Sequence, residues 1–236
     1  MLKALKEEKE HRISGGIYHK LQVDMTYNSN HIEGNKLTHD ETRYIYETKT
    51  IGVFNQTIKV DDIIETVNHF RCTDLAIDSA EYKLSESLIK QFHYILKSGT
   101  SDSSLSWFNV GDYKLIPNEV GGYETTPPEK VKEEIRNLLA EYNSKTNITV
   151  YDIIQFHQRF ECIHPFQDGN GRVGRLIMFK ECLKHNIVPI LITDKMKEYY
   201  YRGLKQRDTQ NRYLIETCLY GQDIVKKYLD YFRIVY

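Results

Sequence analysis

The stretch from His164 to Arg175 holds the side chains of this chain with the clearest chemical use. It reads HPFQDGNGRVGR. His164 opens the stretch, and an imidazole that titrates near neutral pH suits a general base. Asp168 offers the hard carboxylate oxygen that Mg²⁺ prefers when it bridges phosphates. Arg172 and Arg175 offer guanidinium groups, which fit a polyphosphate better than a single carboxylate.

The glycines in this stretch predict an anion-binding turn. Gly169 and Gly171 flank Asn170, so the backbone can take positive φ angles there. Successive backbone N–H groups in such a turn form a nest for an anion, and the N-terminus of the helix that follows adds its positive end. Arg172 and Arg175 are three residues apart, so both should project from one face of that helix. Base, acid, nest and two arginines together predict a phosphate-transfer site, because a plain turn needs none of them.

Composition narrows the class of protein. The chain has 236 residues, 40% of them hydrophobic, which is enough for one compact domain. Its 32 Lys and Arg against 33 Asp and Glu give no basic excess, so we expect no nucleic-acid partner. No run approaches the roughly 20 apolar residues of a membrane helix. The charged start, MLKALKEEKEHR, lacks the apolar run of a signal peptide. The four widely spaced cysteines read as reduced thiols, so a cytoplasmic protein is expected.

Helical periodicity runs through almost the whole chain. Capping residues or a first-turn proline predict helices that begin near Thr38, Ser85, Pro128 and Thr149. An apolar stripe indicates another helix; it consists of Ile63, Ile64, Val67 and Phe70. A further helix follows the glycine turn and stops near Asn186, and two or three more are expected over 194–234.

The stretch 107–126 departs from this helical pattern. Short apolar runs there are broken by Gly111, Pro117, Gly121 and Gly122, which predicts a β-hairpin. Residues 187–192 could be extended too, but Pro189 argues against a paired central strand. The predicted fold is an all-α helical bundle with one β-hairpin.

The stretch from His164 to Arg175 resembles the signature of Fic-domain proteins, His-Pro-Phe-x-(Asp/Glu)-Gly-Asn-Gly-Arg-x-x-Arg, and every specified position matches. The resemblance extends over about residues 20–220. It implies the Fic fold, in which the hairpin is a flap. Fic proteins mostly transfer AMP from ATP to a hydroxyl of a target protein, so the resemblance implies ATP as substrate and Mg²⁺, or Mn²⁺, as cofactor. In the kinase-like Doc branch the glycines and first arginine are altered, so their presence here favours AMP transfer.

The resemblance also implies roles for single residues. His164 would deprotonate the target hydroxyl and Asp168 would hold the metal on the α- and β-phosphates. Arg172 would pair with the β-phosphate and Arg175 would face the γ-phosphate. Phe166 would be buried and orient the loop. The other implied phosphate-binding positions are Gly169, Asn170, Gly171, Val173 and Gly174.

A second motif lies near the N-terminus. Ser29 and Glu33 are one helical turn apart, and Gly34 follows as a helix stop. By itself this is an ordinary short helix, but it resembles the inhibitory motif (Ser/Thr)-x-x-x-Glu-(Gly/Asn) of a Fic class. The resemblance implies an N-terminal region, 1–50, with an inhibitory helix at about 24–34, and a catalytic core, 51–236. In that class the glutamate pairs with the second signature arginine, here Arg175, and denies it to the γ-phosphate.

Two alternatives to an autoinhibited adenylyltransferase stay open at this stage. Some relatives of this class remove AMP from a modified target with the same glutamate and a divalent metal, so Glu33 could serve both reactions. The other alternative is a non-catalytic, nucleotide-binding dimer module. A homodimer is expected in either case.

The predicted hairpin and a downstream helix resemble two further parts of Fic proteins. Val120, Gly121, Gly122 and Tyr123 correspond to the flap, on which an extended segment of the target protein docks as an added strand. Tyr123 and Thr125 are hydroxyls near the flap that we consider for self-modification. The implied adenine-side residues are Tyr200, Tyr201 and Asp208, the last standing where relatives often have Asn.

Overall fold

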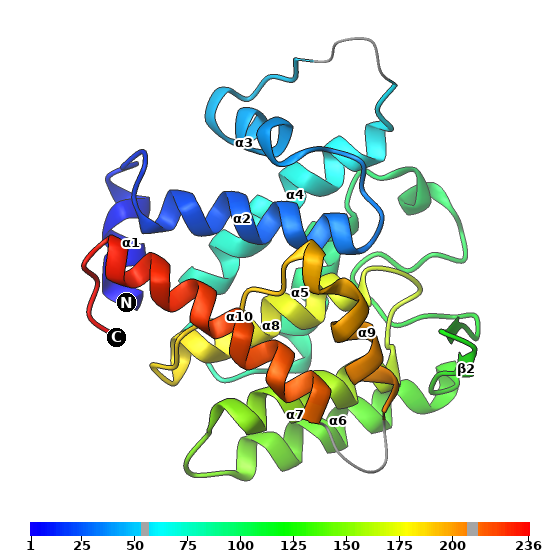
Figure 1. The fold of residues 1–236 in the computed structure, drawn as a ribbon. Helices are drawn as coiled ribbons and strands as arrows, with labels where there is room; N and C mark the ends of the chain where they lie inside the picture. The colour runs from blue at the N-terminus through cyan, green and yellow to red at the C-terminus, as the bar shows by residue number, and fades with distance from the viewer. Residues whose placement is uncertain (53–56, 207–211) are drawn as a thin grey trace.

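Helices form nearly all of the regular structure of the protein (Figure 1). The computed structural model describes residues 1–52, 57–206 and 212–236. The α-helices in these residues are α1 (Leu2–Glu10), α2 (Ile17–Ile32), α3 (His39–Thr48), α4 (Val60–Asp78), α5 (Glu86–Lys97), α6 (Pro128–Ser144), α7 (Val150–Ile163), α8 (Asn170–Lys184), α9 (Lys197–Lys205) and α10 (Arg212–Tyr231). Two short 3₁₀ helices, η1 (Ser101–Ser104) and η2 (Asp194–Met196), and one hairpin, β1 (Glu119–Val120) and β2 (Tyr123–Glu124), complete them. The predicted all-α fold with one hairpin is confirmed.

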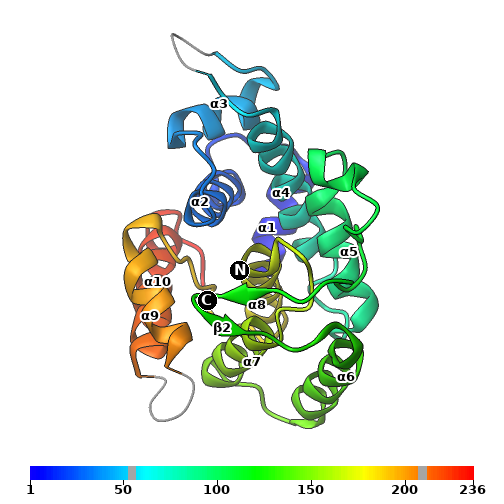
Figure 2. The same cartoon turned by 90° about the vertical axis from the view of Figure 1, so that its right-hand side faces the viewer.

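Helix α8 lies in the middle of the bundle. It packs against α7, α4, α5 and α2 (Figure 2). Apart from Gly171 and Lys184, its residues are all buried. Val173, Leu176 and Phe179 on it are fully buried, and such a helix must be covered on every side. The start of α8, which carries the arginines, is therefore held by several neighbouring elements.

The capping signals in the sequence identify helix starts correctly. Thr38 and Thr149 both form capping boxes, at the starts of α3 and α7. The Ser85 side chain accepts a hydrogen bond from the N–H of Leu88, and Pro128 is the first residue of α6. These interactions involve neighbours in sequence, which is why they could be predicted without the fold.

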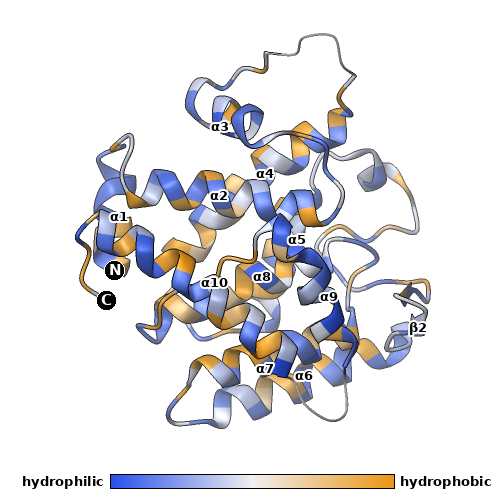
Figure 3. Ribbon diagram, in the orientation of Figure 1, coloured by the Kyte–Doolittle hydropathy of each residue, from blue (hydrophilic) through white to orange (hydrophobic). Residues whose placement is uncertain are grey.

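The apolar stripe of α4 predicted the helix but not its buried face. Val67 is 42% exposed, and Ile63 and Ile64 are only partly buried. Phe70 of the stripe is buried, and the buried face combines such apolar side chains with polar ones. Asn68 donates hydrogen bonds to the carbonyls of Leu96 and Ser98 at the end of α5. The face of α4 is polar because it satisfies buried backbone groups of its neighbour, and Figure 3 accordingly shows hydrophilic as well as hydrophobic bands along this helix.

The strands are shorter than the predicted hairpin stretch. Within 107–126 only Glu119–Val120 and Tyr123–Glu124 pair, with Val120 opposite Tyr123. Gly121 and Gly122 both have positive φ, which a two-residue hairpin turn requires. The stretch before β1 makes turns, and 187–192 forms no strand.

None of the described helices is long and apolar enough to cross a membrane.

Helix α2 is longer than the inhibitory helix predicted at about 24–34. It begins at Ile17, and Glu33 is its C-cap residue. Side chains from both predicted regions share one hydrophobic core, for example Leu21 and Ile32 with Phe92 and Phe160. The two termini lie side by side, and the amino group of Met1 donates to the carbonyl of Val235 (Figure 1). The N-terminal helices are thus packed as part of the bundle.

We expect Thr149→Ala to lower the free energy of unfolding by about 1 kcal/mol, because it removes the N-cap of α7. Chemical denaturation followed by circular dichroism measures this. The exposed Thr146, three residues earlier in the same loop, is the matched control, and Thr146→Ala should change little. Equal losses in the two variants would contradict a stabilising capping box at Thr149.

Candidate active site

The loop between α7 and α8 is fixed by its own side chains. Phe166 is fully buried, and its ring stacks on His93 at 4.0 Å between ring centroids. The Asn170 side chain accepts a hydrogen bond from the Phe166 N–H and donates one to the Phe166 carbonyl, both at 2.8 Å. His164 ends α7 with φ of 51°, and Gly169 begins α8 with φ of 81°. These contacts hold the loop in one conformation without help from a ligand.

One of the two glycines beside Asn170 takes the positive φ that the sequence allows. Only Gly169 adopts it, since Gly171 is already in the helix. The absence of a side chain at Gly171 serves another purpose. A Cβ there would clash with Oε1 of Glu33, so the glycine makes room for that carboxylate at the N-terminus of α8. The close approach could not be read from the sequence because 138 residues separate the two positions.

His164 is neutral at pH 7 in this environment. Burial and, to a smaller extent, the nearby ammonium of Lys114 together lower the pKa of its imidazole to about 4. The pKa of His164 is therefore not near neutral, as the sequence alone had led us to expect. A neutral imidazole is the form that accepts a proton. Among the described residues, no side chain is hydrogen-bonded to Nδ1 of His164, so the ring is not committed to another side chain there.

Asp168 and Arg172 form an ion pair at the start of α8. The guanidinium Nη2 of Arg172 lies 3.0 Å from Oδ2 of Asp168, and Nζ of Lys97 lies 2.7 Å from the same oxygen. Arg172 also contacts the carboxylate of Glu65 on α4. Burial alone would raise the pKa of Asp168, but Arg172 and Lys97 outweigh it and hold that pKa well below its ordinary value. Asp168 is therefore a carboxylate at any physiological pH.

Arg175 extends toward α2. Its Nη2 lies 2.6 Å from Oε1 of Glu33 and donates to the carbonyl of Ser29 at 2.9 Å, while Nε donates to the Ser29 hydroxyl at 3.0 Å. The tyrosine hydroxyl of Tyr200 is 3.4 Å from Nη1. The two arginines of α8 thus point to different partners, Arg172 to α4 and Arg175 to α2, although the sequence placed them on one face. The structure brings Ser29 and Glu33 to the signature residues, as the resemblance implied.

A group of buried polar residues below Gly174 was missed in the sequence. A Cβ at Gly174 would lie 2.6 Å from Oε1 of Glu161 and 2.7 Å from Nδ1 of His157. Burial raises the pKa of Glu161 to about 8, and burial lowers the pKa of His157 to about 3. The His157 Nε2 is 2.6 Å from the hydroxyl of Tyr200. His157, Glu161 and His164 follow one another at helical spacing on α7, which is the signal that could have indicated them.

The remaining candidate positions differ in how accessible they are. Val173 is fully buried and its N–H donates to the carbonyl of Gly169, so neither group faces the site. In the flap, Val120 and Tyr123 are 41% and 49% exposed. Thr125 is buried and hydrogen-bonded to Lys114, so the prediction of a self-modification site suits only Tyr123.

The flap is joined to the signature loop by two hydrogen bonds. The N–H of Lys114 donates to the carbonyl of Pro165 at 2.9 Å, and the Asn118 side chain donates to the carbonyl of Phe166 at 3.1 Å. The hairpin therefore lies beside the loop that carries His164.

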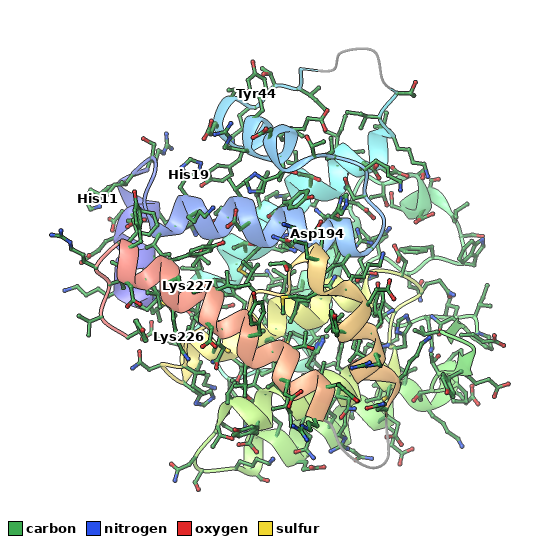
Figure 4. All side chains as sticks on the ribbon, viewed as in Figure 1. His11, His19, Tyr44, Asp194, Lys226 and Lys227 are labelled. Carbon is green, nitrogen blue, oxygen red and sulfur yellow. The ribbon has the colours of Figure 1, made fainter. Side chains whose placement is uncertain are left out.

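The adenine-side residues lie on or after α9. Tyr200 is fully buried, and the hydroxyl of Tyr201 donates to the carbonyl of Ile32 at 3.2 Å. Asp208 lies outside the described residues. The N–H of Asp194, just before α9, donates to the side chain of Asn28 at 2.9 Å, so this part of the chain lies beside α2 (Figure 4).

Comparison with known proteins defines the class. Residues 83–182 match the family model of the Fic/DOC family. The chain is 25% identical over 187 residues to protein adenylyltransferase fic-1 of Caenorhabditis elegans, an alignment that covers 75% of this chain and 35% of the relative. It is 28% identical over 203 residues to a probable protein adenylyltransferase of Aquifex aeolicus, covering 80% of this chain and 60% of the relative. The chain thus spans about a third to three fifths of the length of these curated relatives.

Solved structures show the same fold beyond the matched residues. A Fic domain containing signaling protein from Bacteroides thetaiotaomicron superimposes with a TM-score of 0.78 at 24% identity, over 97% of this chain and 91% of that chain. A Fic-1 structure from Caenorhabditis elegans, residues 134–508, gives 0.74 at 19% identity, over 97% and 69% of the chains. The fold, the signature and the family match agree, and residues 83–182 of this chain match the Fic/DOC family.

The raised pKa of Glu161 makes stability depend on pH. The folded state keeps its proton up to about pH 8, whereas the unfolded chain releases it near the ordinary value of 4.5. Stability linked to this group is therefore complete below about pH 4.5 and is lost as pH rises toward 8. Each pKa unit corresponds to about 1.4 kcal/mol.

The variant Glu161→Gln mimics the protonated acid. We expect it to become more stable than the wild type as pH rises. The difference in Tm should grow by at least roughly 3–6 °C between pH 5 and pH 9, since that is the effect of a single pKa unit in a chain of this size. Thermal unfolding at both pH values measures it. The exposed Glu133 on α6 supplies the control, Glu133→Gln. A pH-independent difference would mean that Glu161 is already ionised in the folded protein.

Proposed function

We propose that this chain is a protein adenylyltransferase, which transfers AMP from ATP to a hydroxyl of a target protein. One observation carries the proposal. A single loop and the first turns of α8 place a neutral histidine, a carboxylate and two arginines around a helix N-terminus. The match of residues 83–182 to the Fic/DOC family and the relatives named protein adenylyltransferase support it.

The residues suggest how the transfer would proceed. ATP would place its phosphates at the N-terminus of α8, with Arg172 on the β-phosphate and Arg175 on the γ-phosphate. A target segment paired with the flap would bring its hydroxyl to His164. The hydroxyl oxygen attacks the α-phosphorus while His164 accepts its proton, and the bond to the β-phosphate oxygen breaks. Pyrophosphate leaves with that electron pair, and AMP stays on the target.

Asp168 fits the role of ligand to Mg²⁺ or Mn²⁺. Its side chain is 49% exposed, it is ionised, and both protein cations contact Oδ2, so we assign the other oxygen to the metal. No group of three or more His, Cys, Asp or Glu in the described residues could hold a metal, so phosphates and water would supply the other ligands. When bound, the metal would neutralise charge on the phosphates.

We further propose that α2 holds the enzyme in an inhibited state. Arg175 is 5% exposed and its donors are engaged by Ser29 and Glu33. The γ-phosphate needs the same guanidinium, so it has to displace Glu33. The carboxylate also occupies the space over Gly171, where a phosphate would approach the helix N-terminus.

Removal of AMP from a modified target is the second candidate. The position of the Glu33 carboxylate against Gly171 favours it, because a carboxylate beside a bound phosphate could orient an attacking water. Loss of Glu33 separates the two reactions, since it should raise transfer and abolish removal. A purely nucleotide-binding module would release no pyrophosphate in the presence of a protein acceptor.

We expect His164→Ala to lower transfer by about 10²–10⁴-fold, the usual cost of losing a general base. ATP binding should survive, because other residues hold the nucleotide. Transfer of labelled AMP and calorimetric ATP binding measure the two effects. In the wild type the rate should rise with pH through about 4 and then level off, since the base is active once deprotonated. Wild-type transfer by His164→Ala would remove the role assigned to this residue.

We expect Glu33→Gly to raise transfer about 10- to 150-fold. It releases a charge-assisted hydrogen bond to Arg175, which contributes roughly 1.5–3 kcal/mol. Self-modification with labelled ATP measures the gain. The double variant Glu33→Gly with Arg175→Ala should not show it, because the freed arginine is what the γ-phosphate needs. Equal labelling of wild type and Glu33→Gly at matched protein and Mg²⁺ would contradict inhibition by α2.

A further inference from the structure

Lys97, the last residue of α5, is a buried cation at the edge of the candidate active site. Its side chain is 2% exposed. Nζ lies 2.6 Å from Oε1 of Glu65, 2.7 Å from Oδ2 of Asp168 and 3.2 Å from Oδ2 of Asp102. These acids come from α4, the signature loop and η1. Three carboxylates from separate elements thus converge on one ammonium group.

Arg172 joins the same two principal acids from the other side. Its guanidinium contacts the second oxygen of Glu65 and Oδ2 of Asp168. Glu65 and Asp168 are therefore bridged by two protein cations. The ring of Phe108 lies 5.4 Å from the ammonium of Lys97 and covers it on another side. Carboxylates converging on one small cation are the donors that Mg²⁺ and Mn²⁺ prefer, but here an ammonium occupies the centre.

The charges of this cluster explain why Lys97 stays where it is. Burial of an ammonium is costly, but the carboxylates of Glu65 and Asp168, at 2.6 and 2.7 Å, compensate its charge. The cluster holds three acids and two cations, counting Arg172. Loss of the Lys97 charge would leave three carboxylates against one guanidinium. An excess of negative charge on carboxylates that lie this close together favours uptake of a cation.

We propose that Lys97 is a positioning residue that competes with the divalent metal for Asp168 and thereby sets the metal affinity of the site. The inference rests on the proposed function, which assigns Asp168 to the metal. While no nucleotide is bound, the ammonium of Lys97 compensates the negative charge of the Asp168 carboxylate. The protein alone therefore binds metal weakly. Phosphate oxygens of ATP then supply the ligands that make metal binding favourable. A purely structural Lys97 would only join α4, α5 and η1.

The test is a Mn²⁺ titration of the protein alone, followed by the electron paramagnetic resonance signal of free Mn²⁺. The variant Lys97→Met removes the charge and keeps most of the volume, and we expect it to bind Mn²⁺ at least tenfold more tightly than the wild type. Lys97→Arg keeps the charge and should bind Mn²⁺ like the wild type. A wild-type affinity below detection counts as an upper limit for this comparison.

A second neutral variant keeps the test decisive if Lys97→Met fails to fold. Lys97→Gln can still donate hydrogen bonds to Glu65 and Asp168, so it should fold even if Lys97→Met does not, and it should also gain at least tenfold in Mn²⁺ affinity. Thermal unfolding checks the fold of each variant. A folded neutral variant with wild-type Mn²⁺ affinity would overturn the proposal, whatever its Tm.

The measurement also separates this inference from the proposed function. It uses neither ATP nor a target protein, so absence of AMP transfer cannot produce or hide the expected gain. Unchanged Mn²⁺ affinity in the neutral variants would leave the transfer proposal standing, because that proposal is tested by labelled AMP.

Discussion

The buried guanidinium of Arg175 is the constraint on which most of the site depends. A charge that is 5% exposed is stable only with nearby acceptors. The acceptors come from one short stretch of α2, namely the hydroxyl and carbonyl of Ser29 and the carboxylate of Glu33. This requirement couples a helix near the N-terminus to the central helix α8. It also places Glu33 where Gly171 leaves space for it.

The same physical rule organises the other side of α8. Arg172 and Lys97 are buried cations, and Glu65, Asp102 and Asp168 surround them. The polar face of α4 follows from this, since a helix beside buried charges must offer them partners. Helix α8 is thus divided along its length. Its first two turns carry the two signature arginines with their partners, whereas the rest is mostly apolar core and holds one buried ion pair, Lys180 with Glu181.

Both arginines of the signature are already paired with carboxylates in this structure, so a nucleotide has to compete with these carboxylates. A triphosphate has to replace Glu33 on Arg175 and to share Arg172 with Glu65 and Asp168. The site is therefore prepared for anions but occupied by the protein's own carboxylates. The core that holds them includes residues from α1 to α10 among those the structure describes, and the likeness to a Fic structure covers 97% of this chain.

The sequence by itself determined what depends on neighbours along the chain. The helix caps at Thr38, Ser85 and Thr149, the glycine turn of the flap and the signature from His164 to Arg175 are local patterns with local causes. Only the tertiary structure decided the partners of buried charges: which carboxylates meet Arg172, Arg175 and Lys97, why Gly171 lacks a side chain, and why Glu161 keeps its proton. Those outcomes depend on burial and on contacts between groups that are far apart in the sequence. They could not be predicted from the sequence, because electrostatic interactions become strong only where folding excludes water.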